Sequence, residues 1–254
     1  MSNSSKSRVT TALLLAAGTG SRLKPLTIDK HKCLTMLHGA SILERLLACL
    51  NHHKFKRLIV VTGYLDDSIR EFLGDEVGDV KIEYIFCSQY KDTNNIYSLW
   101  MARKVISESF LLLECDLVFD KSMLNEMIYP DKMAVAQIEP WMNGTCITIN
   151  ESKQITSFLK SNEECSVSKY KTVNIYSISL DSWRTIEKKL ENHISEGKVN
   201  DYYEIVFAEM LSENTLAFDV AFFDNKYWYE IDTIKDLEMA EEVFLEAAMA
   251  NKIT

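Results

Sequence analysis

The sequence contains few of the residues that interrupt regular structure. Its 254 residues include 8 glycines and 3 prolines, whereas an average glycine usage of about 7% would supply roughly 18. Two of the glycines, Gly18 and Gly20, are separated by a single residue, and Pro25 follows closely. Glycine, which makes the backbone flexible, and proline, which makes it rigid, therefore occur together in one loop. This loop is the first candidate for a functional site.

Three further absences exclude classes of protein. No apolar run approaches the roughly 18 residues of a membrane span, and residues 1–9 lack the apolar stretch of a signal peptide. Positive charge is in deficit, with 28 Lys and Arg against 37 Asp and Glu, which argues against nucleic-acid binding because that requires a basic face. The six cysteines include no C-x-x-C pair, so we expect reduced thiols. Together these features predict a cytoplasmic protein with no membrane partner and with residues 1–9 as a disordered tail.

The first half of the chain alternates apolar runs with helix-like segments. We expect strands at 10–16, 57–62, 80–86 and 110–115, and helices at 42–50, 66–73 and 95–105. Ser41, with Glu44 three residues later, indicates a capping box at the first helix. This order predicts an α/β fold, a Rossmann-like three-layer α/β/α sandwich with a mixed, mainly parallel central sheet.

The second half has a different pattern. Short alternating or β-branched runs at 132–138, 145–149, 155–159 and 173–178 predict antiparallel additions to the sheet. Helices are expected at 180–194, 201–211 and 233–250, and strands at 216–223 and 227–231. No Pro/Ser-rich linker and no internal repeat divides the chain, so we expect one domain over residues 1–254.

Ligands of open α/β sheets bind at the carboxyl ends of the strands, which directs attention to the loop after the first strand. Glycines there let backbone N–H groups approach an anion, and a side chain at Gly18 or Gly20 would stand where a triphosphate must lie. Positive charge is added by Arg22, Lys24, Lys30 and Lys32. The spacing fits neither the Walker loop nor the dinucleotide fingerprint, and a G-x-G pair alone is also consistent with a tight turn.

Two aspartates, Asp116 and Asp232, follow apolar strand-like runs. A lone aspartate in this position is most often a helix cap or turn residue. Two carboxylates at strand ends that face a basic loop would instead hold Mg²⁺ on phosphate oxygens. The combination favours metal-dependent phosphoryl or nucleotidyl transfer.

The segment from Leu15 to Lys32 closely resembles the signature loop of nucleotidyltransferases that join a nucleoside triphosphate to a sugar phosphate or a small phosphorylated alcohol. The family pattern is roughly L-A-A-G-x-G-x-R-x-x-P-x-T-x-x-x-P-K. His31 stands where the family has its second proline, and this departure keeps the cation of Lys32.

Later segments resemble phosphocholine and 2-aminoethylphosphonate cytidylyltransferases in particular. These segments are 90–100, 113–116, 171–176, 200–204 and 229–233. The resemblance implies a CTP-dependent cytidylyltransferase with Mg²⁺ as cofactor. Such an enzyme would transfer CMP to a small phosphorylated or phosphonate acceptor and release pyrophosphate.

The resemblance also implies roles for individual residues. Arg22 and Lys32 would stabilise charge on the triphosphate, and Lys171 would grip the acceptor phosphate. Asp116 and Asp232 would hold Mg²⁺, with Glu230 as a third carboxylate. The residues implied in nucleotide binding are Leu15, Ala16, Ala17, Gly18, Thr19, Gly20, Ser21, Arg22, Gln89, Thr93, Asn94, Ser98 and Cys115.

The acceptor is indicated by aromatic and acidic residues, because aromatic faces beside a carboxylate suit an amino or ammonium group. The acceptor-binding residues implied by the resemblance are Trp141, Asn174, Asp201, Tyr203 and Trp228. The aromatic residues among them are equally typical of core packing. Phosphocholine, 2-aminoethylphosphonate and an amino-acid-derived phosphate all stay open.

Two other functions stay open beside the cytidylyltransferase. One is a sugar-1-phosphate nucleotidyltransferase that uses UTP or dTTP, and the other is a non-catalytic nucleotide-binding regulator. Retention of Lys32, Asp116 and Asp232 argues against the regulator, which has no use for metal ligands. A homodimer also stays open, although the apolar face of the final helix is expected to pack on its own domain.

Overall fold

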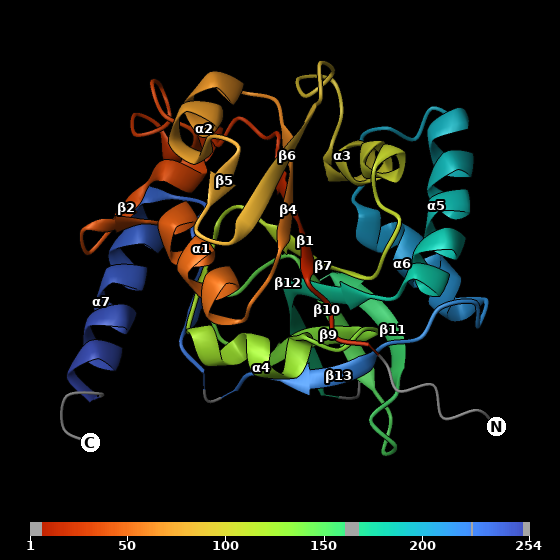
Figure 1. Ribbon diagram of the computed structural model, residues 1–254. Helices are drawn as coiled ribbons and strands as arrows, with labels where there is room; N and C mark the ends of the chain where they lie inside the picture. Colours follow the sequence, from red (N-terminus) through yellow and green to blue (C-terminus); the bar gives the residue numbers. More distant parts are fainter. Residues whose placement is uncertain (1–6, 161–167, 225, 251–254) are drawn as a thin grey trace.

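The computed structural model describes residues 7–160, 168–224 and 226–250 and is built around one large sheet (Figure 1). Its centre is parallel, with the order β7 (Phe110–Glu114), β1 (Thr11–Ala16), β4 (Arg57–Thr62) and β6 (Val80–Phe86). All six residues of β1 are buried, as expected for a central strand that is covered on both faces.

Helices cover both faces of this sheet (Figure 1). α1 (Ile42–His52) and α2 (Asp66–Leu73) contribute to one hydrophobic core with alternate residues of β1. α3 (Asn95–Met101), α5 (Leu180–Ser195) and α6 (Tyr203–Ser212) contribute to a second core with the other residues of β1. This separation follows from the two-residue period of a strand.

The second half adds antiparallel strands beside β7. They are β12 (Lys169–Ile178), β10 (Thr145–Ile149), β11 (Ile155–Lys160) and β9 (Lys132–Gln137), while β5 (Glu76–Val77) closes the opposite edge. β13 (Asp219–Phe222) pairs with β9 in parallel. The Rossmann-like, mixed and mainly parallel fold class is thereby confirmed, with the antiparallel additions where they were expected.

Two features of the second half set the geometry of the site. β12 carries Asn174 with φ of 58°, and its pairing with β9 shifts register between Thr172 and Tyr176. A separate two-stranded ribbon, β8 (Leu117–Phe119) with β14 (Trp228–Glu230), follows β7 directly. The expected strand over 227–231 contains β14, but β8 was missed because its three apolar residues follow the strand ending at Cys115 after a single aspartate.

Several short elements were also missed, and some predicted bounds were wrong. The short elements are β2 (Met36–Leu37), β3 (Ala40–Ser41), α4 (Leu124–Met127) and 3₁₀ turns at Ser21–Leu23, Lys32–Leu34, Ala102–Lys104 and Lys121–Met123. The helix expected over 95–105 ends as an α-helix at Met101, and the strand expected over 216–223 is four residues long. The capping box is present, because Ser41 Oγ accepts from the Glu44 N–H at 3.2 Å and the Glu44 carboxylate accepts from the Ser41 N–H.

The ends of the chain differ in part from expectation. Of the tail expected over residues 1–9, residues 1–6 lie outside the described residues, whereas Val9 is buried and its N–H donates to Ile128 O at 2.8 Å. The final helix α7 (Ile234–Ala250) packs on the β8–β14 ribbon with Ala240 buried. Cys33, Cys49, Cys87 and Cys115 are free thiols and, like Cys146, are buried, while Cys165 lies outside the described residues. In the part of the chain that is described, no helix is long and apolar enough to cross a membrane.

Candidate active site

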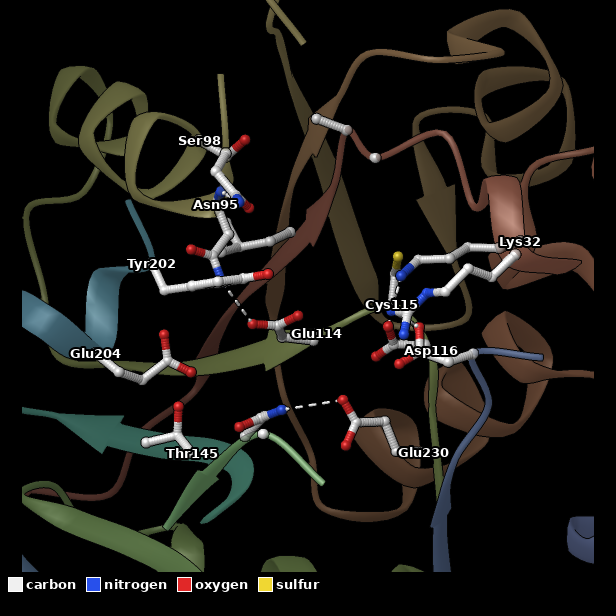
Figure 2. Close-up of a pocket in the computed structure, with 18 of the residues that line it drawn as sticks. Lys32, Asn95, Ser98, Glu114, Cys115, Asp116, Thr145, Tyr202, Glu204 and Glu230 are labelled. Atoms are coloured by element: carbon white, nitrogen blue, oxygen red, sulfur yellow. Dashed lines mark hydrogen bonds and ion pairs between the residues drawn. The ribbon is translucent and has the colours of Figure 1, made fainter. Parts of the chain in front are cut away.

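A pocket of about 650 Å³ opens at the carboxyl ends of β1 and β7 (Figure 2). Fourteen of the predicted site residues line it: Leu15, Ala17, Gly18, Arg22, Lys32, Thr93, Asn94, Ser98, Cys115, Asp116, Lys171, Asn174, Glu230 and Asp232. Eight residues line it that were not among the predicted ones: Tyr90, Asn95, Glu114, Asn143, Gly144, Thr145, Tyr202 and Glu204. Nine predicted residues lie elsewhere: Ala16, Thr19, Gly20, Ser21, Gln89, Trp141, Asp201, Tyr203 and Trp228.

One end of the pocket, which we call the phosphate end, is formed by Lys32, Asp116, Asp232 and Arg22. Lys32 Nζ donates to Asp116 Oδ2 at 2.5 Å, and Arg22 forms an ion pair with Asp232 at 2.8 Å. Burial alone would lower the pKa of Lys32, but the adjacent Asp116 raises it well above its usual value. Lys32 is therefore a permanent cation at this end.

The β8–β14 ribbon explains how two aspartates far apart in the sequence come together. Glu230 stands opposite Leu117 in the ribbon, and the Ile231 N–H donates to Asp116 O at 2.9 Å. Burial and the charge of Asp116 raise the pKa of the Asp232 carboxyl, as expected for two carboxylates that share one site. A cation between them would relieve this repulsion.

His31, the departure from the family pattern, has a structural role in the phosphate end. Its Nε2 lies 3.1 Å from Gly18 O, and its Nδ1 accepts from the Cys33 N–H at 3.3 Å. Burial, and secondarily Lys32, lowers the pKa of His31 to about 4. A neutral ring with its proton on Nε2 satisfies both contacts, and it ties the glycine loop to the turn that carries Lys32.

The two glycines of the loop have different requirements. A Cβ on Gly18 would meet no atom within 4 Å, so its face toward the pocket is open. Gly20 has φ of +57°, and a Cβ there would lie 3.0 Å from Lys32 Cβ. A side chain at Gly20 would therefore strain the backbone and press on Lys32, and its effect on a triphosphate stays a prediction.

The fit of Mg²⁺ to the phosphate end can be tested on the carboxylate oxygens. Asp116 is 3% exposed, and its Oδ1 has no hydrogen-bond partner among the described residues. Mg²⁺ is commonly held by one or two carboxylates together with substrate phosphates, so Asp116 and Asp232 fit it. No group of three His, Cys, Asp or Glu residues that could hold a metal occurs within residues 7–160, 168–224 and 226–250. Glu230 lines the same pocket and pairs with Lys171 at 3.3 Å, so its role as a third carboxylate ligand stays a prediction.

The other end of the pocket, which we call the acid end, is formed by Glu114, Glu204, Asn95 and Tyr202 (Figure 2). Glu114 Oε1 accepts from Asn95 Nδ2 at 3.1 Å and from the Tyr203 hydroxyl at 3.0 Å. Burial, with the charges of Asp116 and Glu204, raises the pKa of Glu114 to about 8. Burial also raises the pKa of Glu204 to about 7, although its own backbone N–H, Lys171 and Asn95 act in the opposite direction.

The aromatic residues that were predicted to bind the acceptor pack against protein instead. Trp141 stacks on Tyr229 with 4.1 Å between ring centroids and 11° between planes, and it also contacts Trp228. Tyr203 is fully buried, with its hydroxyl on Glu114. Of the predicted acceptor set, Asn174 alone lines the pocket. Glu114 and Glu204 lie within the segments 113–116 and 200–204, whose resemblance to cytidylyltransferases is the sequence signal for the acid end.

Lys171 lies between the two ends and is 2% exposed. Its Nζ donates to Thr172 O at 2.7 Å and forms an ion pair with Glu230. The Glu230 carboxylate also accepts from Asn174 Nδ2 at 3.5 Å. This buried cation lines the pocket and is fixed by these contacts.

Comparison with known proteins identifies the family. The family model described as MobA-like NTP transferase domain matches residues 12–138, which is half of the chain. The chain belongs to this family. The match includes the glycine loop, Lys32 and Asp116, and it ends before the acid-end residue Glu204.

Two relatives of this NTP transferase domain are longer proteins. CMP-5'-(3-aminopropyl)phosphonate synthase of Streptomyces rubellomurinus is 27% identical over 245 residues, covering 91% of this chain and 38% of that protein. Bifunctional protein GlmU of Methanococcus vannielii is 25% identical over 243 residues, covering 94% of this chain and 56% of that protein. The chain thus spans about half or less of their length.

A solved structure, that of CTP:phosphocholine cytidylyltransferase from Streptococcus pneumoniae, has the same fold. It superimposes with a TM-score of 0.77 at 21% identity, over 94% of this chain and 100% of that one. The Rossmann-like nucleotidyltransferase fold is therefore shown by both sheet topology and superposition.

Proposed function

We propose that this NTP transferase domain is a CTP-dependent cytidylyltransferase. It transfers CMP to a small phosphorylated or phosphonate acceptor that bears an amino or ammonium group, and it releases pyrophosphate. The observation that carries the proposal is the phosphate end, where the Lys32–Asp116 pair and Asp232 lie beside the open face of Gly18. The 27% identical relative that makes a CMP-phosphonate supports cytidine and an amino-bearing acceptor.

The reaction is an in-line displacement at the α-phosphorus. An acceptor oxygen forms a bond to that phosphorus, and the bond to the bridging oxygen of the β-phosphate breaks, so pyrophosphate leaves. The acceptor oxygen is already anionic and needs no general base. Positioning and neutralisation of charge therefore supply most of the catalysis.

The residues of the pocket divide this task. Backbone next to Gly18 accommodates the triphosphate, and Lys32 stabilises the charge that grows around the α-phosphate. Arg22 is 63% exposed at its side chain, so it can turn from Asp232 to the outer phosphates. Lys171 draws the acceptor phosphate toward the reacting centre.

Mg²⁺ fits the two carboxylates Asp116 and Asp232. When bound, it neutralises phosphate charge and orients the triphosphate. The free Oδ1 of Asp116 is the best placed protein ligand for it.

A second candidate is a sugar-1-phosphate nucleotidyltransferase, which the 25% identical bifunctional GlmU relative favours. The two functions share the phosphate end and differ in base and acceptor. The acid end separates them, because a neutral sugar offers no cation to the buried carboxylates of Glu114 and Glu204.

Pyrophosphate release with four nucleoside triphosphates and a panel of acceptors, in the presence of Mg²⁺, tests the proposal. The panel contains 2-aminoethylphosphonate, 3-aminopropylphosphonate, phosphocholine and glucose 1-phosphate. We expect turnover with CTP and an amino-bearing acceptor. Preference for UTP or dTTP with the sugar phosphate would establish the second candidate, and no turnover with any pair would favour a non-catalytic regulator.

A further inference from the structure

The carboxyl groups that line the pocket outnumber the cationic side chains, and the excess lies at the acid end. Five carboxylates and three cationic side chains line the pocket. At the phosphate end, Asp116 and Asp232 are neutralised by Lys32 and Arg22, and Glu230 is neutralised by Lys171. Glu114 and Glu204 have no such ion pair among the described residues.

Glu204 is the clearest case. It lies in the first turn of α6, is 7% exposed and points into the pocket from the side opposite Lys32 and Asp116 (Figure 2). Its Oε2 is buried with no hydrogen-bond partner among the residues described. A buried acceptor atom without a donor is costly unless a ligand supplies one.

The neighbouring groups are fixed in place. Asn95 Oδ1 accepts from the Tyr203 N–H at 3.1 Å, while Asn95 Nδ2 donates to Glu114. Two elements far apart in the sequence, α3 and α6, are therefore joined across the carboxylate at the end of β7. A ligand entering the acid end meets a preorganised pair of carboxylates.

The chemistry of this end distinguishes two kinds of cation. A quaternary ammonium group has no N–H, and proteins bind it with several aromatic faces. Tyr202 is the aromatic residue lining the acid end, and it is 57% exposed, while Trp141, Trp228 and Tyr203 are packed against protein. A primary ammonium group has three N–H donors and matches the unpartnered oxygen of Glu204.

We infer that the acceptor carries a primary ammonium group, which Glu204 and Glu114 bind, and that a trimethylammonium acceptor is discriminated against. This inference rests on the proposed function for the identity of the reaction, but it specifies the substrate class of the same pocket. Phosphoethanolamine and phosphocholine are matched probes, because they differ by three N-methyl groups alone.

Calorimetric titration of the whole chain with each probe, with and without CTP and Mg²⁺, measures the discrimination directly. We expect phosphoethanolamine to bind about 10- to 100-fold more tightly than phosphocholine, as for a lost hydrogen bond to a charged group. Equal binding, or tighter binding of phosphocholine, would overturn the inference. Tight amine binding without any pyrophosphate release would leave the inference standing and refute the cytidylyltransferase.

Glu204→Gln removes the charge while keeping the size of the side chain. We expect the preference for phosphoethanolamine to fall by about tenfold or more, with the KM for CTP unchanged. The matched control is Glu209→Gln on the same helix, where the carboxylate pairs with Lys189 and His193 outside the pocket. If Glu204→Gln instead raised the KM for CTP and left the amine preference intact, Glu204 would recognise the nucleotide and the inference would be wrong.

Discussion

The phosphate end and the acid end of the pocket are built on opposite electrostatic principles. At the phosphate end each carboxylate has a cation within ion-pair distance, such as Lys32 on Asp116 at 2.5 Å. At the acid end the buried Glu204 and the half-buried Glu114 have no ion pair among the residues that the structure describes, and desolvation raises the pKa of both. At the phosphate end an anionic ligand can replace the carboxylates as the partner of Lys32 and Arg22. At the acid end a ligand with a positive charge would supply the partner for the carboxylates.

The largest effect is expected from removing the charge of Asp116. Asp116→Asn should lower kcat/KM for pyrophosphate release by about 1000-fold or more, because the proposed metal ligand and the partner of Lys32 are lost together. Circular dichroism should show an unchanged fold. Asp79→Asn, which removes an exposed ion pair with Lys56, is the control and should have little effect. Activity within tenfold of the wild type would remove Asp116 from the metal site.

The acid end is expected to reduce stability at high pH. The pKa of Glu204 is raised to about 7 in the folded chain, so the folded state binds more protons than the unfolded state between its usual value and 7. The free energy of unfolding then falls as pH rises through this window. Glu204→Gln should abolish that loss and stabilise the chain by about 3 kcal/mol at pH 8, with little gain near pH 4.5.

Glu204 and Glu209 lie on the same helix, α6, and Glu209 forms ion pairs with Lys189 and His193. Burial opposes ionisation of Glu209, but hydrogen bonds from His193 and Lys189 lower its pKa overall. Glu209→Gln should therefore be destabilising at pH 8, opposite in sign to Glu204→Gln. Denaturant unfolding of both variants at pH 5 and pH 8 measures the signs, and the same sign for both would show that Glu204 is not strained by burial.

Substitutions of the two loop glycines should separate an effect on stability from an effect on nucleotide binding. Gly20→Ala should destabilise the chain by about 1–2 kcal/mol, because an alanine at φ of +57° is strained. Gly18→Ala should leave stability unchanged and raise the KM for CTP, because its Cβ would enter an open face of the pocket. Thermal unfolding and steady-state kinetics on both variants separate these effects. Equal loss of stability would contradict the distinction.

Sequence reasoning succeeded where a signal is local. The strands over 57–62 and 80–86 and the helix over 66–73 were predicted to the residue, because apolar runs and periodicity are contiguous. The phosphate end shares this property in part, since one loop from Leu15 to Lys32 carries Arg22 and Lys32, two of its four residues. The meeting of Asp116 with Asp232 required the additional assumption that strand ends converge.

The acid end escaped sequence reasoning for a physical reason. Trp141 and Trp228 were assigned to the acceptor because aromatic faces suit cations, but large apolar rings gain more by packing on each other. Glutamates are almost always solvated, so their residue type does not show that Glu204 is buried and Glu114 half-buried. Their burial depends on α6 closing over the end of β7, a contact between segments about ninety residues apart.

The smallest expected effect tests whether that contact positions the acid end. Tyr203→Phe removes the hydroxyl that donates to Glu114 Oε1 at 3.0 Å but leaves the Asn95 bond and the buried ring. Loss of one hydrogen bond to a carboxyl should raise the KM for the amino acceptor about three- to tenfold, with kcat and the KM for CTP unchanged. Steady-state kinetics with one substrate varied at a time measures this division. An equal rise in the KM for CTP would mean that the two ends are not independent, because a carboxylate that had moved at the acid end would then disturb the phosphate end as well.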